Sequence, residues 1–170
     1  MINNILHNRV MKEVIIESKL IVYENLEQLP EDIIMLMEKA FKARENAYAP
    51  YSKFHVGAAI LLDNGEVITG NNQENASYPS GLCAERTAIY YAGSQYPDAK
   101  INKIAISAGS TSKINTEPIP PCGACRQAIA EYEIKQKESI EIYFMGEKGN
   151  VIKSHSLANL LPLVFDKTVL

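Results

Sequence analysis

The stretch FHVGAAILLDNGEVITGNN, residues 54–72, predicts a β-hairpin whose first strand is a central strand of a sheet. Residues 54–62 are apolar on both faces, which is typical of a buried central strand. The Asp63-Asn64-Gly65 sequence that follows is a strong tight-turn signal. Residues 66–72 then return as a second strand. The other elements can be placed around this hairpin.

Segments with helical periodicity alternate with strand-like segments on both sides of the hairpin. Residues 31–47 carry apolar side chains at helical spacing, and acidic residues at their front suit the positive end of a helix dipole. Residues 11–24 are rich in Val and Ile and are interpreted as a strand, although helical spacing also fits. Further along the chain we expect helices at 83–92, ended by Gly93, and at 122–132, strands at 103–109, 139–146 and 151–154, and a helical turn near 157–161. This alternation indicates a layered α/β domain with a mixed sheet.

Composition narrows the functional class. The chain has 170 residues, which suits one domain, and its formal net charge of −3 gives no support to a nucleic-acid surface. Its apolar runs fall short of the roughly 20 residues that a membrane helix needs. The start of the chain lacks the features of a signal peptide. We therefore expect a cytoplasmic protein without a membrane or nucleic-acid partner.

Cys83, Cys122 and Cys125 are the three cysteines of the chain, and their placement suggests a metal site. Cys83 and Cys122 each follow a loop and open a predicted helix, where free N–H groups and the helix dipole favour the thiolate. Three thiolates around one zinc ion leave the fourth position open for water, as in catalytic zinc sites. His55 is the histidine that best qualifies as a fourth ligand.

Residues beside the cysteines supply what such a site needs. Glu85 can reach a water at the open position and exchange protons with it. Arg86 can donate hydrogen bonds to a thiolate sulfur and offset the net charge of −1 that three thiolates leave on a divalent ion. Gln127, one turn into the second helix, is a weaker candidate for similar support.

Each of these features also has an ordinary interpretation. An isolated cysteine is most often a small buried hydrophobe, and an adjacent Glu-Arg pair usually lies on the solvated surface. A single C-x-x-C such as CGAC at 122–125 can be a redox pair. The joint arrangement is more specific, because C-A-E followed by P-C-x-x-C matches the all-cysteine form of the zinc deaminase pattern.

The chain resembles the cytidine deaminases, specifically the three-cysteine type. The resemblance covers roughly residues 31–166 and rests on PYSKFHVGAAI at 50–60, GNNQENASYPSGLCAERTA at 70–88, PCGACRQ at 121–127 and LLPLVF at 160–165. It implies a three-layer α/β/α fold with a mixed sheet of about five strands. It also implies a catalytic domain at 30–170, with residues 1–29 as an extension.

The resemblance also implies functional roles for individual residues. Cys83, Cys122 and Cys125 would bind one Zn²⁺ per subunit, and Glu85 would be the proton shuttle in the deamination of cytidine and deoxycytidine. A homotetramer with active sites near subunit interfaces is expected. The residues implied in substrate binding are Asn72 and Glu74 for the ribose, Phe54 for the pyrimidine, the backbone at Ala84 for the base edge, and Phe165, which would reach a neighbouring subunit's site.

Two alternatives remain open at this point. One is the same chemistry on another substrate, such as blasticidin S, guanine or a base in a nucleic acid. The other is a zinc-stabilised binding module without catalysis, which would require a fourth protein ligand.

Overall fold

The computed structural model describes residues 11–170. The expectation that the chain starts without a signal peptide concerns mainly residues 1–10, which lie outside the described residues. Within residues 11–170, no helix is long and apolar enough to cross a lipid bilayer.

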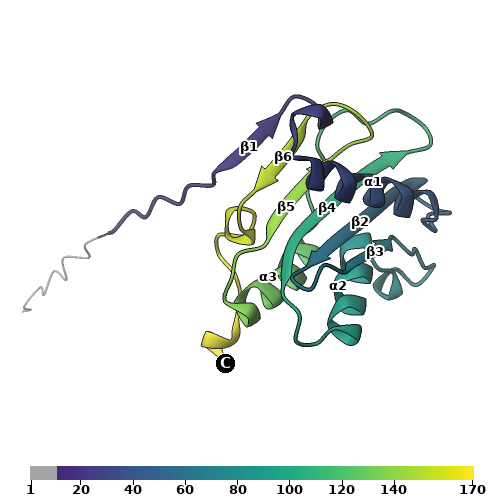
Figure 1. Ribbon diagram of the computed structural model, residues 1–170. Coiled ribbons are helices and arrows are strands. Elements are labelled where there is room, and N and C mark those ends of the chain that lie inside the picture. Colours follow the sequence, from purple (N-terminus) through teal and green to yellow (C-terminus); the bar gives the residue numbers. More distant parts are fainter. Residues whose placement is uncertain (1–10) are drawn as a thin grey trace, which may run out of the picture.

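The centre of the fold is a six-stranded mixed sheet with the strand order β1-β6-β5-β4-β2-β3 (Figure 1). Strands β4 and β5 pair in parallel, and every other neighbouring pair is antiparallel. The strands are β1 (Leu20–Tyr23), β2 (Phe54–Leu62), β3 (Val67–Asn71), β4 (Ile101–Ser110), β5 (Glu141–Met145) and β6 (Val151–Ser154).

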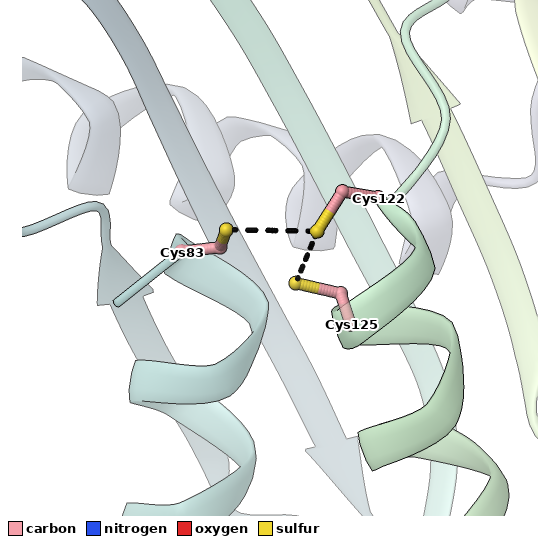
Figure 2. Close-up of side chains that lie close together, drawn as sticks. All are labelled: Cys83, Cys122 and Cys125. Atoms are coloured by element: carbon pink, nitrogen blue, oxygen red, sulfur yellow. Dashed lines mark hydrogen bonds between the residues drawn. The ribbon is translucent and has the colours of Figure 1, made fainter. Parts of the chain in front are cut away.

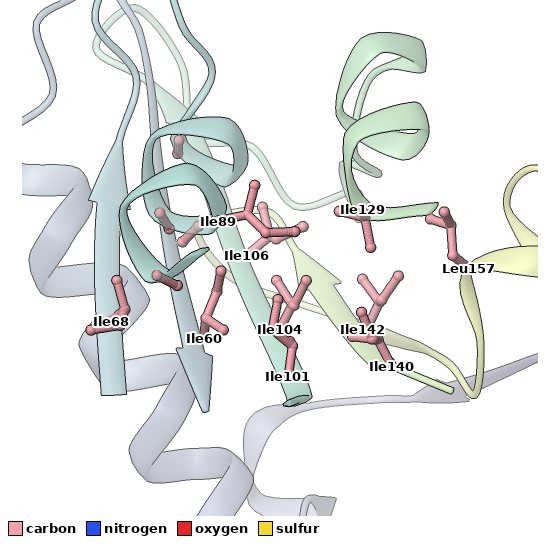
Figure 3. Packing of buried hydrophobic residues seen from close by; sticks show 14 of the residues in the cluster. Ile60, Ile68, Ile89, Ile101, Ile104, Ile106, Ile129, Ile140, Ile142 and Leu157 are labelled. Carbon is pink, nitrogen blue, oxygen red and sulfur yellow. The ribbon is translucent and has the colours of Figure 1, made fainter. Parts of the chain in front are cut away.

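Three helices cover the two faces of the sheet and make three layers. Helix α1 (Glu31–Glu45) packs on one face, and α2 (Ala84–Gln95) and α3 (Gly123–Gln136) pack on the other. The residues of β2 alternate between the two cores: Ala58 and Ile60 contact the α2/α3 side, and Ala59 contacts the α1 side. Figure 3 shows the isoleucine-rich core under α2 and α3. The three-layer α/β/α prediction is confirmed.

The hairpin at 54–72 forms as predicted, with β2 inside the sheet and β3 at its edge. Strand β2 is bordered by β3 on one side and β4 on the other, which explains why it is apolar on both faces. Gly65 adopts a φ of +88° in the turn, a conformation that costs glycine little. The predicted strands near 103–109, 139–146 and 151–154 are likewise present.

The structure differs from the sequence predictions at the first strand and at the ends of two helices. Helix α3 continues to Gln136 instead of ending at residue 132. The sheet has six strands where the resemblance implies about five, and the additional one is β1, which lies within the segment 11–24 interpreted as a strand and pairs with β6. That strand covers four residues of the segment. Helix α2 continues through Gly93 to Gln95. A Cβ at Gly93 would lie 2.5 Å from the Tyr132 hydroxyl of α3, so this glycine permits close helix packing instead of ending the helix.

Candidate metal centre and active site

Two helix N-termini create the site. Cys83 is the N-cap of α2 and Cys122 is the N-cap of α3, both in extended backbone conformation. Neither side chain forms a capping hydrogen bond, so both thiols remain available for other partners. Cys125 lies in the first turn of α3 and is fully buried. The positive ends of both helix dipoles therefore point toward the same group of sulfur atoms.

The three cysteine sulfur atoms converge between the two helices (Figure 2). The Sγ atoms of Cys83 and Cys122 are 3.8 Å apart, and those of Cys122 and Cys125 are 3.5 Å apart. Tetrahedral zinc with Zn–S bonds of about 2.3 Å requires sulfur atoms about 3.8 Å from one another. The donor set therefore fits a zinc ion in both chemistry and spacing.

Proton affinities in this cluster also favour a bound cation. Hydrogen bonding with Cys125, assisted by Arg86 and Cys122, lowers the pKa of the Cys83 thiol to about 5. The pKa of Cys125 is raised, because its thiol hydrogen-bonds to the Cys83 sulfur and is buried. One thiol thus ionises readily while its neighbour is held protonated. A divalent cation would remove this conflict, because it stabilises all three thiolates together.

His55 does not join the cluster. Because successive side chains of a strand point to opposite faces, Phe54 and Val56 line the cavity beside the cysteines while His55 lines a separate hollow with Arg44 and Glu147. Among residues 11–170, the metal-binding cluster consists of the three cysteines alone. The protein thus supplies three of the four ligands of a tetrahedral zinc ion, the donor number of catalytic sites.

Glu85 is a buried carboxyl group at the edge of the cluster. Glu85 is 4% exposed and lines the same cavity as Cys83 and Cys122. Burial is the main cause that raises the pKa of Glu85 to about 7, and the neighbouring Cys83 charge raises it further. A carboxyl group with this pKa can gain and lose a proton near neutral pH, which suits a general acid–base residue.

Arg86 lies where its charge can act on the cluster. Its Nη2 atom donates a hydrogen bond to the Cys83 sulfur at 3.7 Å. This contact matches the supporting role predicted for Arg86, because a cation beside a thiolate offsets its negative charge.

A cavity of about 430 Å³ opens beside the cysteines, which is enough for a nucleoside-sized ligand. Phe54, Asn72 and Glu74 line it together with Glu85. A second hollow of about 500 Å³, bordered by Tyr51 and Tyr78, shares several lining residues with the first. The structure thus brings together three predicted substrate-binding side chains and the predicted proton shuttle.

Asn72 and Glu74 are held in place by backbone groups. The Asn72 side chain accepts a hydrogen bond from the Val56 N–H at 2.8 Å and donates one to the Phe54 carbonyl at 2.9 Å. One carboxylate oxygen of Glu74 accepts from the backbone N–H of Tyr51 at 2.9 Å. The same oxygen accepts from the Ser52 N–H at 3.3 Å. Both side chains line the cavity, so their polar groups border the space in which a ligand would lie.

Three other predicted residues, Ala84, Gln127 and Phe165, are not among those that line the cavity. Ala84 is fully buried as the first residue of α2, where its backbone N–H belongs to the free helix terminus. Gln127 donates from Nε2 to the Phe165 carbonyl at 2.8 Å, which ties the C-terminal segment to α3. Phe165 itself is 62% exposed. Its side chain is therefore accessible at the surface of the chain.

Sequence reasoning missed part of the cavity wall. Ile119 and Pro120 line the cavity opposite Phe54 and Val56. They belong to the loop before Cys122, for which local sequence patterns predict no role in the cavity. Its position directly before a predicted metal ligand was the one available signal.

Comparisons with known proteins agree with this site. The protein-family model of the cytidine and deoxycytidylate deaminase zinc-binding region matches residues 30–138 of this chain. A cytidine deaminase from Halalkalibacterium halodurans is 43% identical over 131 residues, which cover 77% of this chain and 92% of that protein. One from Sporosarcina psychrophila is 41% identical over 136 residues, which cover 80% of this chain and 93% of that protein.

Solved structures show the same fold. The crystal structure of cytidine deaminase from Burkholderia pseudomallei superposes with a TM-score of 0.66 at 38% identity. The match covers 81% of this chain and all of that one. The chain therefore belongs to the cytidine and deoxycytidylate deaminase zinc-binding family, and Cys83, Cys122 and Cys125 form its zinc site.

Proposed function

We propose that this protein deaminates cytidine and deoxycytidine by hydrolysis, yielding uridine or deoxyuridine and ammonia, in pyrimidine salvage. The observation that carries the proposal is the buried Glu85 carboxyl beside a three-sulfur metal site in a nucleoside-sized cavity. A metal site with an open position, a proton carrier and a substrate cavity are the three parts that hydrolytic deamination needs.

The chemistry divides between the metal and Glu85. When bound, one zinc ion per subunit supplies the Lewis acidity that activates a water for attack on C4 of the pyrimidine. Glu85 takes a proton from the attacking water and passes it to N3 of the ring. Glu85 then accepts the remaining proton of the former water and delivers it to the departing amine, which leaves as ammonia. The water oxygen becomes the O4 carbonyl of the product.

Side chains around the cavity hold the nucleoside for this reaction. Glu74 accepts a hydrogen bond from a ribose hydroxyl through its carboxylate, and Asn72 assists through its side-chain amide. The ring of Phe54 packs on the pyrimidine, and the backbone at Ala84 binds the edge of the base. The pairing of Glu74 with the Tyr51 and Ser52 N–H groups fixes the carboxylate before the substrate arrives.

Arg86 and Gln127 support the site indirectly. Arg86 balances the negative charge of the three thiolates through its hydrogen bond to Cys83. Gln127 binds the main-chain carbonyl of Phe165, and its proposed role is to hold this C-terminal segment beside α3.

The quaternary structure is proposed as a homotetramer. The exposed Phe165 then reaches the active site of a neighbouring subunit. Light scattering coupled to gel filtration measures the mass directly, and a monomer at working concentration would contradict this assignment.

We further propose that residues 30–170 are the catalytic domain and residues 1–29 an extension that adds β1 to the sheet. Cytoplasmic localisation is proposed because three cysteines are committed to a metal rather than to disulfides.

A substrate panel tests the function. Purified protein with measured zinc content is assayed for ammonia release from cytidine, deoxycytidine, blasticidin S, guanine and single-stranded DNA. We expect turnover of cytidine and deoxycytidine. Turnover of another compound alone would replace the substrate, and zinc binding without turnover of any of them would favour a binding module.

A further inference from the structure

The loop at 111–121 joins β4 to α3 and forms one wall of the substrate cavity. Ile119 and Pro120 line that cavity, and the loop ends directly before the zinc ligand Cys122. It contains no helix or strand, so its position depends on contacts that other segments make with it.

The turn between β5 and β6 holds the middle of this loop. The Glu147 N–H donates to the Asn115 carbonyl at 2.7 Å. In return, the Glu147 carboxylate accepts from the Asn115 N–H at 3.0 Å. Glu147 thus binds both backbone polar groups of Asn115. Asn115 lies seven positions before Cys122.

Helix α1 in turn holds Glu147. The Nη2 atom of Arg44 lies 3.7 Å from the other carboxylate oxygen of Glu147. The Nη1 atom of Arg44 donates to the Ser107 hydroxyl at 3.1 Å, and this hydroxyl donates to the Gly146 carbonyl at 3.3 Å. These contacts connect α1, β4 and the turn that contains Glu147.

Close packing leaves little freedom in this arrangement. A Cβ at Gly109 would lie 2.4 Å from the Glu147 side chain and 2.9 Å from Arg44 Nη1, so the absent side chain makes room for the pair. The side chains of Arg44 and Glu147 are only 20% and 25% exposed. Such a shielded pair is screened less than an ion pair on the open surface.

We propose that Glu147 is a positioning residue for substrate binding, acting across the sheet by fixing the loop that carries Ile119 and Pro120. The inference rests on the proposed function, because it concerns the cavity in which the nucleoside binds. Glu147 touches neither the cysteines nor the cavity, so its effect passes through Asn115 and the loop. Loss of the carboxylate frees the cavity wall and weakens substrate binding while the reacting groups remain in place.

Glu141 provides the matched control. It lies at the start of β5, at the end of the strand remote from the turn that contains Glu147. Its side chain is 28% exposed, and it pairs with Lys153 and accepts from the Tyr143 hydroxyl at 2.9 Å. These partners belong to β5 and β6 and not to the loop. Removing this carboxylate therefore costs stability without freeing residues 111–121.

The experiment compares the wild type with Glu147→Ala, Glu147→Gln and Glu141→Ala. We measure kcat and KM for cytidine, zinc content, melting temperature and amide hydrogen exchange. In Glu147→Ala we expect KM to rise about fivefold, the effect of one lost hydrogen bond, with kcat within about twofold. The Asn115 amide should exchange faster. Glu147→Gln should have a KM close to that of the wild type, because its amide oxygen still accepts from the Asn115 N–H.

Glu141→Ala should lower the melting temperature with an unchanged KM. An unchanged KM in Glu147→Ala, or an equal rise in Glu141→Ala, would overturn the inference. Hydrogen exchange separates this failure from failure of the proposed function. If the wild type does not deaminate cytidine, faster exchange at Asn115 in Glu147→Ala alone would still support the role in holding the loop, and unchanged exchange would refute it.

Discussion

Replacement of Glu85 by glutamine should make the metal-free protein more stable and the enzyme almost inactive. The substitution keeps the size of the side chain and removes its charge and its ability to carry a proton. In the fold, burial raises the pKa of Glu85 from 4.5 to about 7, which means that the folded state disfavours the ionised carboxylate.

The size of the stability effect follows from this pKa. One pKa unit corresponds to about 1.4 kcal/mol, so the difference between unfolded and folded values amounts to roughly 3 kcal/mol. Because the folded pKa lies above the unfolded one, the wild type loses this free energy of unfolding as pH rises from 4.5 to about 7. The glutamine in Glu85→Gln does not ionise, so the variant keeps this free energy of unfolding at high pH. The variant should therefore be more stable by about 2 to 3 kcal/mol at pH 8, and by less than about 1 kcal/mol at pH 5.

Urea denaturation of the metal-free proteins, prepared with a chelator, measures this difference in free energy of unfolding at pH 5 and pH 8. Deamination of cytidine by the zinc-loaded proteins gives kcat, which should fall by about 10²- to 10⁴-fold in the variant. Zinc content should be unchanged, because the three sulfur ligands are intact. Glu131→Gln, on an exposed position of α3, controls for the chemical change itself and should alter neither quantity.

Two results would refute the reasoning. A variant that retains wild-type kcat would show that Glu85 carries no essential proton. A variant no more stable than the wild type at pH 8 would show that burial does not penalise this carboxylate, and the link between its burial and its catalytic pKa would fail.

Other changes probe the rest of the site. Glu74→Gln should raise KM for cytidine about tenfold with little change in kcat, since a neutral oxygen is a weaker acceptor for ribose; steady-state kinetics with an unchanged KM would contradict the role. Asn72→Ala should lower the free energy of unfolding by about 2 kcal/mol, because two backbone groups of β2 lose their partners; an unchanged urea midpoint would count against this. Cys125→Ser should lose most bound zinc in metal analysis, whereas His55→Ala should retain it; zinc loss in the latter would restore His55 as a ligand.

Local sequence patterns were sufficient for most of the fold. The hairpin at 54–72, helix α1 and the strand at 103–109 were predictable because apolar periodicity and turn residues act over short distances. The extent of the first strand and the end of α2 were not predictable in the same way. β1 covers the residues that pair with β6, and Gly93 lies inside α2, where Tyr132 of another helix packs closely against it.

The reactive groups were equally predictable from the sequence. Cys83, Glu85 and Arg86 stand together at one helix start, and P-C-x-x-C marks the other, so short-range spacing identified the zinc ligands. Tertiary contacts were needed to see that His55 faces away from the sulfur atoms.

The shape of the substrate cavity depends on segments far apart in the sequence. Ile119 reaches the cavity from a loop that residues of α1 and of the β5–β6 turn hold in place, and no local pattern records such contacts. The amino-acid sequence thus specified which atoms react, because metal ligands and a proton carrier follow short motifs. Folding specified how the cavity is walled and how strongly Glu85 holds its proton, because packing and burial are properties of the assembled chain.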